Sequence, residues 1–144
     1  FSYKAISTLD SMIGYKFKPF KYLGLFSAKV EDYATFLPCR VVLLTLPLVS
    51  TKIFKYFNLI KKSFSEGRKY ESPNSGISEG IFAFIADIQL GGENKYHEKI
   101  ISKPILNSNG KKCNSSSIKH ICNLIIRLEF LWLAAFSLIF LKIN

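Results

Sequence analysis

The longest apolar part of this chain is residues 121–143, and it predicts a helix that crosses a membrane. Residues 130–141 carry no charge, and Trp132 fits a membrane–water interface. A span needs about 20 apolar residues, which this segment supplies. Arg127 and Glu129 interrupt its N-terminal side, so a buried or interfacial helix stays the alternative.

A second apolar run, residues 41–51, lies between Arg40 and Lys52 and contains Pro47. Because a span needs about 20 apolar residues, so short a run favours a re-entrant or interfacial helix. Residues 54–62 mix aromatic side chains with lysines, as amphipathic helices at a membrane surface do. We therefore predict that residues 37–62 form a re-entrant or interfacial region.

A third apolar pattern recurs at helical spacing and predicts one buried helix face. Its members are Ile77, Ile81, Phe84, Ile85 and Ile88. Ser78 is the predicted N-cap of this helix, and Gly91-Gly92 is its predicted end.

The polar segments around this helix predict irregular structure. Ser72-Pro73-Asn74-Ser75-Gly76 reads as a dense polar turn ahead of the helix, because Pro, Asn, Ser and Gly each favour turns. Residues 61–70 read as a charged linker. Residues 98–120, with Asn109-Gly110 as a turn signal, read as a loop.

Together these patterns predict a mainly α protein, a helical integral-membrane fragment with polar loops and one or two membrane-associated helices. The 144 residues form one domain with four regions, residues 1–36, 37–62, 63–120 and 121–144. The formal charge of +10 is compatible with anionic lipids or anionic substrates. The 49% hydrophobic content and the lack of a dense basic tract argue against a nucleic-acid module.

The three cysteines predict neither a disulfide framework nor a metal cluster. Cys113, His120 and Cys122 lie near one another in the sequence, but no C-x-x-C pair accompanies them. The thiols are better read as buried or idle.

Three blocks of this sequence resemble the CobD/CbiB family, the adenosylcobinamide-phosphate synthases. The first is Lys4-Ala5-Ile6-Ser7-Thr8-Leu9-Asp10-Ser11-Met12-Ile13-Gly14-Tyr15-Lys16. The second runs from Glu31-Asp32 to Leu37-Pro38-Cys39-Arg40. The third joins Ser72-Pro73-Asn74-Ser75-Gly76 and Glu79 to Leu90-Gly91-Gly92 and Tyr96.

The resemblance implies a step of cobalamin biosynthesis in an integral membrane protein, of which this chain resembles the C-terminal half. In that step ATP drives amide formation between adenosylcobyric acid and (R)-1-amino-2-propanol or its phosphate. The implied partners are the corrinoid, the aminopropanol, membrane lipid and other cobalamin-synthesis enzymes. Three departures from the family pattern stand in the second block, where Glu31 replaces an Asp, Thr35 replaces an Asn and Cys39 replaces a small residue.

The chemistry that the resemblance implies assigns candidate roles to residues of the three blocks. Triphosphate chemistry uses Mg²⁺ held by one or two carboxylates, and cationic groups that hold phosphate. The metal candidates are Asp10, Glu31 and Asp32. The catalytic candidates are Asp10, Asp32 and Glu79. The candidates for binding phosphate or substrate are Lys4, Lys16, Arg40, Ser72, Asn74, Gly76 and Tyr96.

Simpler structural readings stand beside these roles. Asp10 would then cap a turn, Glu31-Asp32 would form a solvated helix face, and Arg40 would anchor a membrane border. Three other functions stay open: a non-catalytic scaffold that binds corrinoids, an inactive fragment of the synthase, and a basic interfacial membrane binder.

The expected location is the cell membrane, multi-pass in the full-length protein, with the motif loops in the cytoplasm where ATP is found. A re-entrant region at residues 37–62 would leave the blocks around Asp10 and Asn74 on one side of the membrane. Residues 61–119 hold ten of the twenty Lys and Arg residues, which agrees with a cytoplasmic location.

Overall fold

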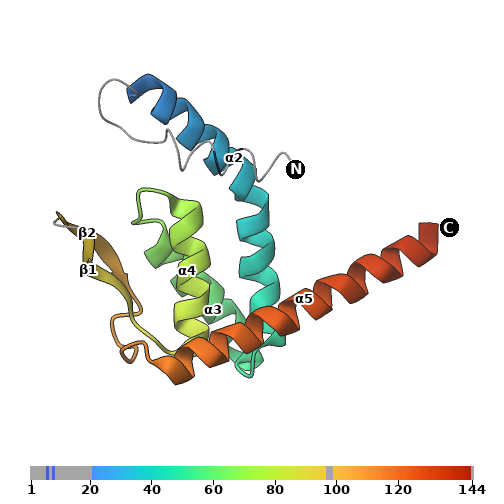
Figure 1. The fold of residues 1–144 in the computed structure, drawn as a ribbon. Helices are drawn as coiled ribbons and strands as arrows, with labels where there is room; N and C mark the ends of the chain where they lie inside the picture. The colour runs from blue at the N-terminus through green and yellow to red at the C-terminus, as the bar shows by residue number, and fades with distance from the viewer. Residues whose placement is uncertain (1–5, 7, 9–20, 97–98, 144) are drawn as a thin grey trace. The chain divides into compact units, whose positions relative to one another are not determined.

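The computed structural model describes residues 6, 8, 21–96 and 99–143 as a mainly helical protein with one β-hairpin (Figure 1). It forms two compact units, Phe1–Val41 and Val42–Asn144. The elements in order are α2 (Lys21–Thr45), η1 (Leu46–Val49), η2 (Ile53–Lys55), α3 (Tyr56–Gly67), α4 (Pro73–Ala86), β1 (Leu90–Tyr96), β2 (Lys99–Leu106) and α5 (Ser115–Ile143).

Helix α2 corrects the prediction of a separate short helix in residues 41–51. The first five residues of that apolar run are the last residues of a 25-residue helix that contains Pro38. Pro47 follows in the first turn of η1, where the missing N–H of proline costs little. The segment Gly24–Val49 is long and apolar enough to cross a membrane. The shortness of the run therefore no longer supports a re-entrant path, and the topology of residues 37–62 stays a prediction.

Helix α3 includes most of the predicted charged linker, because residues 61–67 are helical. Its buried residues are Leu59, Ser63 and Gly67, and the last two have small side chains. Ser63 satisfies its hydroxyl by donating to the Leu59 carbonyl oxygen at 2.7 Å. Such a face lets another helix backbone come close.

Helix α4 packs on α3 through glycines. A Cβ atom at Gly67 would overlap the backbone of Gly76 and Ile77, and one at Gly80 would lie 3.3 Å from the Ser63 carbonyl oxygen. The apolar face predicted for this helix is confirmed for Ile77, Ile81, Phe84 and Ile85, which are buried, whereas Ile88 is buried just beyond the helix end. Helix α4 therefore makes two kinds of contact: its glycines touch α3, and its large apolar side chains are buried in the hydrophobic core.

Both predicted ends of α4 are wrong. The helix begins at Pro73 with Ser72 at its N-cap, so Asn74 to Gly76 are helical and Ser78 lies inside the helix. Proline is favoured in a first turn, where its lack of an N–H leaves no bond unmade. The helix ends at Ala86, where Asp87 adopts a left-handed φ of 57°.

The predicted loop of residues 98–120 contains β2, which pairs with β1 in an antiparallel hairpin. Gly91 and Gly92 lie inside β1 at φ values of 85° and 81°, and the pairing is irregular between Leu90 and Gly92. The Asn109-Gly110 turn signal is confirmed: the Gly110 N–H donates to the Asn107 carbonyl oxygen at 2.8 Å.

Asn107 joins the end of the hairpin to both helices. It adopts a left-handed φ of 51°, and its backbone N–H donates to Glu66 Oε2 at 2.7 Å. Its side-chain Nδ2 donates to the carbonyl oxygens of Ala83 at 3.2 Å and Ile88 at 3.1 Å. These bonds fix the hairpin against the α3–α4 pair.

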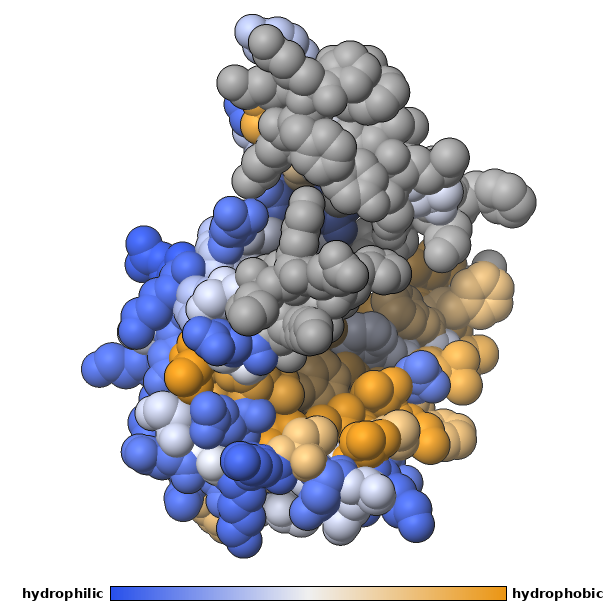
Figure 2. Space-filling view, turned by 60° about the vertical axis from the view of Figure 1, so that its left-hand side comes forward, coloured by the Kyte–Doolittle hydropathy of each residue, from blue (hydrophilic) through white to orange (hydrophobic). Residues whose placement is uncertain are grey.

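Helix α5 begins six residues before the predicted segment, where Asn114 Oδ1 accepts a bond from the Ser117 N–H at 2.8 Å. Leu124 and Leu128 are buried in its first half. The second half exposes Phe130, Phe136 and Phe140. The hydropathy colouring of Figure 2 shows a broad apolar area on the surface of the protein. Only 11% of the most apolar window of α5 is buried, which a soluble core helix would not show. By length and composition α5 is the second helix able to cross a membrane.

Substitution of Gly67 by alanine should destabilise the second unit. The new Cβ would press on the α4 backbone, and overpacking of this kind costs about 1–3 kcal/mol. The Ser65→Ala variant, changed at an exposed site of the same helix, is the control. The thermal unfolding midpoint in detergent measures the effect, and equal midpoints for both variants would contradict the packing described here.

Candidate functional site

A pocket of about 330 Å³ lies where the α3–α4 connection, the start of α4 and strand β2 meet. Its walls include both serines of the Ser-Pro-Asn block and residues of the hairpin. The lining residues are Tyr70, Glu71, Ser72, Ser75, Ser102, Lys103 and Pro104. Four residues with hydroxyl groups, one cation and one carboxylate therefore line the same space.

Ser72 marks the N-terminus of α4 at this pocket. Its side chain does not cap the helix, although its carbonyl oxygen accepts the Gly76 N–H at 3.1 Å. The start of a helix carries a partial positive charge, which favours an anion. One turn further on, the Ser75 hydroxyl donates to Glu79 Oε1 at 3.0 Å. The structure thus brings Ser72 to the pocket and connects Glu79 to it through Ser75.

Tyr70 is a buried wall residue, only 8% exposed. Its hydroxyl has no hydrogen-bond partner among the described residues. Burial, with a smaller contribution from the nearby Glu79 carboxylate, raises the pKa of Tyr70 to about 12. Tyr70 therefore stays a neutral phenol, able to donate a hydrogen bond, throughout the physiological pH range.

Gly76 and Gly91 make room for Tyr70. A Cβ atom at Gly76 would lie 2.8 Å from Cβ and Cγ of Tyr70, and one at Gly91 would lie 3.1 Å from its hydroxyl oxygen. This packing accounts for a glycine at position 76 without any ligand. A role of its N–H group in binding an anion stays a prediction, as does any role of Asn74, whose side chain is buried.

Among the described residues that line the pocket, Ser72 is the one predicted site candidate, and Lys103 is the charged residue of the hairpin that the sequence does not single out. Its Nζ lies 5.9 Å from the centroid of the Tyr70 ring. The residue belongs to β2, which was predicted to be loop, and no motif surrounds it. Only the register of the hairpin, which pairs Lys103 with Gly92, identifies it as a neighbour of the third block.

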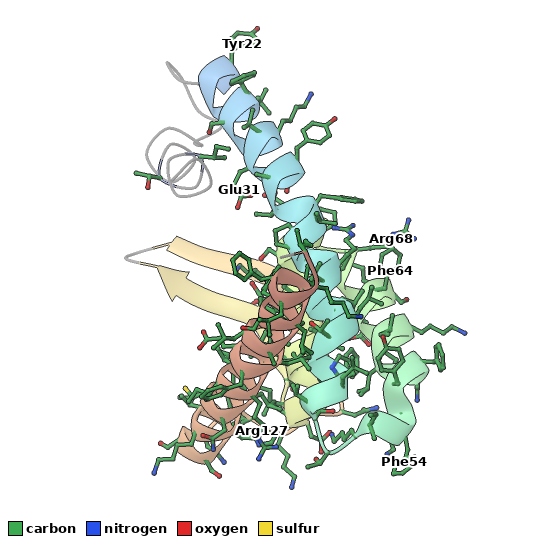
Figure 3. The ribbon with its side chains drawn as sticks, turned by 90° about the vertical axis from the view of Figure 1, so that its right-hand side faces the viewer. Tyr22, Glu31, Phe54, Phe64, Arg68 and Arg127 are labelled. Atoms are coloured by element: carbon green, nitrogen blue, oxygen red, sulfur yellow. The ribbon has the colours of Figure 1, made fainter. Side chains whose placement is uncertain are left out.

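Glu31, labelled in Figure 3, and Asp32 are consecutive residues of α2 in the first unit, and both are half-buried. Carboxylate oxygens are the hard ligands that Mg²⁺ prefers, but consecutive side chains of a helix do not face each other, so their positions on α2 do not by themselves form a paired site. Thr35, which replaces the family's Asn, directs its hydroxyl to the Glu31 carbonyl oxygen at 2.8 Å. It therefore bonds the helix backbone.

Arg40 also bonds its own helix. Its Nη1 donates to the Phe36 carbonyl oxygen at 3.2 Å, and its guanidinium lies 3.8 Å from the centroid of the Phe36 ring. This arrangement suits the anchoring alternative as well as a site that binds anions.

Other predicted site residues lie at or beyond the limits of the structure. Lys4, Asp10 and Lys16 fall outside the described residues. The backbone of Tyr96 pairs with Lys99 at the tip of the hairpin. Within the described ranges, no group of three His, Cys, Asp or Glu residues could hold a metal ion.

Comparison with known proteins gives the family. The family model described as CobD/Cbib protein matches residues 1–125. A "Cobalamin biosynthesis protein CobD" of Synechocystis is 49% identical over 105 residues, which cover 73% of this chain and 30% of the relative. A protein of the same name in Streptococcus sanguinis is 34% identical over 141 residues, 97% of this chain and 45% of the relative.

A third relative of that name, in Clostridium acetobutylicum, is 37% identical over 125 residues, 86% of this chain and 39% of the relative. The chain thus spans less than half the length of these relatives. No solved structure matches it. The sequence matches cover all three blocks, including the residues that form the pocket, and this chain belongs to the CobD/CbiB family.

Proposed function

We propose that this chain is part of a membrane protein of cobalamin biosynthesis that carries out an ATP-dependent amide ligation. In that reaction a propionate carboxylate of adenosylcobyric acid joins the amine of (R)-1-amino-2-propanol or its phosphate. Family membership and the names of the relatives support the pathway. The observation that carries the binding step is the pocket that the Ser-Pro-Asn block forms with Lys103.

The pocket is suited to a substrate that bears a phosphate. Lys103 supplies a positive charge, and the hydroxyls of Ser72, Ser75 and Ser102 supply hydrogen-bond donors. The N-terminus of α4 adds a favourable dipole. In this proposal the Glu79 carboxylate, held by the Ser75 hydroxyl, accepts the proton that the attacking amine loses.

ATP with Mg²⁺ would supply the activation that a carboxylate, a poor electrophile, needs before an amine can attack it. Glu31 and Asp32 are the described residues that would hold the metal, with Asp10 as a further candidate. Arg40, Lys4 and Lys16 are proposed to bind phosphate or carboxylate groups by charge. The relatives' extra length leaves room for further binding groups.

The proposed location is the cell membrane, with the motif loops facing the cytoplasm. Helix α5 is the proposed span. Residues 37–62 are proposed to enter and leave the bilayer on the same side, because only such a path keeps the first and third blocks on one side of the membrane. Membrane lipid, the corrinoid and other cobalamin-synthesis enzymes are the proposed partners.

The Asp32→Ala variant should lower ATP-dependent turnover of adenosylcobyric acid by roughly 10- to 100-fold, as loss of a metal ligand does. The assay uses membranes that contain this chain joined to the part of the Streptococcus sanguinis relative that it does not cover. Glu129→Gln, an exposed change on α5, is the control. Full turnover in the Asp32 variant would remove Asp32 from the reaction, and corrinoid binding without any turnover would favour a scaffold.

The Lys103→Ala variant should raise KM for the phosphorylated amine by about tenfold and leave kcat nearly unchanged, because it removes a charge used in binding. The unphosphorylated amine should show little change in KM. Lys112→Ala removes an exposed lysine elsewhere in the second unit and serves as the matched control. An unchanged KM for both amines would place the phosphate outside this pocket.

Cysteines at positions 11 and 71 should react with a membrane-impermeant maleimide from the same, cytoplasmic side. Ser11→Cys and Glu71→Cys are placed separately in a chain whose native cysteines, Cys39, Cys113 and Cys122, are serines. Labelling in sealed right-side-out and inside-out vesicles gives the sidedness. Reaction from opposite sides would refute a shared cytoplasmic location of the first and third blocks.

A further inference from the structure

One exposed face of η2 and α3 carries three phenylalanines and two basic side chains. We call it the aromatic–basic stripe, and its members are Phe54, Phe57, Lys61, Phe64 and Arg68. From Phe57 onward the intervals are four, three and four residues, which place these side chains on one face of a helix. Figure 3 shows Phe54 near one end of the segment, and Phe64 and Arg68 near the other.

The stripe faces away from the core of the second unit. Phe54 is fully exposed, Phe57 is 84% exposed and Phe64 is 38% exposed. The other side of α3 carries the buried Leu59, Ser63 and Gly67, which pack on α4. Three exposed phenylalanines in line are unfavourable in water, so the stripe has the character of a contact surface.

The charge of this segment has one sign. Residues 52–69 contain six Lys or Arg residues and a single acid, Glu66. Glu66 is turned to the hairpin, where its Oε2 accepts the Asn107 N–H. Lys52 is bonded to the Phe84 carbonyl oxygen at 3.1 Å, whereas Lys61 and Arg68 lie exposed on the stripe. The Arg68 guanidinium lies 5.4 Å from the centroid of the Phe64 ring, so a ring and a cation are presented together.

The stripe is continuous with the end of a candidate membrane span. Only residues 50–52 separate the segment Gly24–Val49 from η2. The hydroxyl of Tyr56, the first residue of α3, donates to the Leu44 carbonyl oxygen at 2.9 Å. The start of α3 is therefore bonded to the last turn of the helix that would leave the bilayer.

We propose that the aromatic–basic stripe lies in the headgroup layer of an anionic lipid bilayer. Aromatic rings favour the boundary between headgroups and acyl chains, and Lys and Arg side chains bind anionic headgroups while their stems lie along apolar surface. An acidic protein partner would satisfy the charges but would not explain three phenylalanines at the exit of a span. The proposal depends on no catalytic role of any residue.

The test places an environment-sensitive fluorophore beside the stripe. Ser65→Cys, exposed and off the stripe, is labelled in a chain whose native cysteines are serines, and Asn109→Cys in the exposed turn is the reference. Both are reconstituted in phosphatidylcholine vesicles with phosphatidylglycerol. Lipids that carry a nitroxide headgroup should quench the position 65 probe several-fold more than the position 109 probe.

Removal of the negative lipid charge, or of the positive charge on the stripe, should reduce the difference in lipid quenching between positions 65 and 109. Vesicles of phosphatidylcholine alone, or the double variant Lys61→Glu/Arg68→Glu, should lower lipid quenching at position 65 several-fold. The matched double variant Lys112→Glu/Lys119→Glu should leave it unchanged. The comparison of vesicle compositions uses the unaltered stripe, so it holds even if the charge-reversed chain misfolds.

Two outcomes would overturn the proposal. Equal lipid quenching at positions 65 and 109 would show that the stripe lies in water. Protection of position 65 from both the nitroxide lipid and aqueous iodide would show that protein covers it.

Discussion

The close approach of α3 and α4 is the contact on which the arrangement of the second unit depends. Where Gly67 meets Gly76 and Ile77, there is no room for a Cβ atom, so the two backbones touch. Contacts of this kind depend on small residues, because only they let helix axes come so near. The connection between the helices is then short, and it holds Tyr70 over Gly76 at the mouth of the pocket.

Long apolar patterns could be predicted from the sequence, because burial or lipid contact determines them directly. The inner face of α4 and the uncharged half of α5 are examples. The charged residues 61–67 were misread as a linker, since exposed charges are equally compatible with the outer face of a helix. The start of α4 was misplaced because Pro73 and Gly76, which favour turns, are accommodated in a first helical turn and in a helix contact.

The hairpin was missed for a different reason. Its strands contain two glycines, a proline and several charged residues, and they do not alternate between apolar and polar positions. Their position comes instead from distant contacts, above all those of Asn107 with Glu66, Ala83 and Ile88. The motif residues of the site could be recognised from the sequence, whereas Lys103 is found only once the hairpin register is known.

The unpartnered hydroxyl of Tyr70 bears on which residue evolution would retain at position 70. A buried oxygen without a partner lowers stability, and phenylalanine would fill the same space without that penalty. Selection for stability alone would therefore replace Tyr70 by phenylalanine. Retention of tyrosine at this position in natural variants would indicate selection for the oxygen itself.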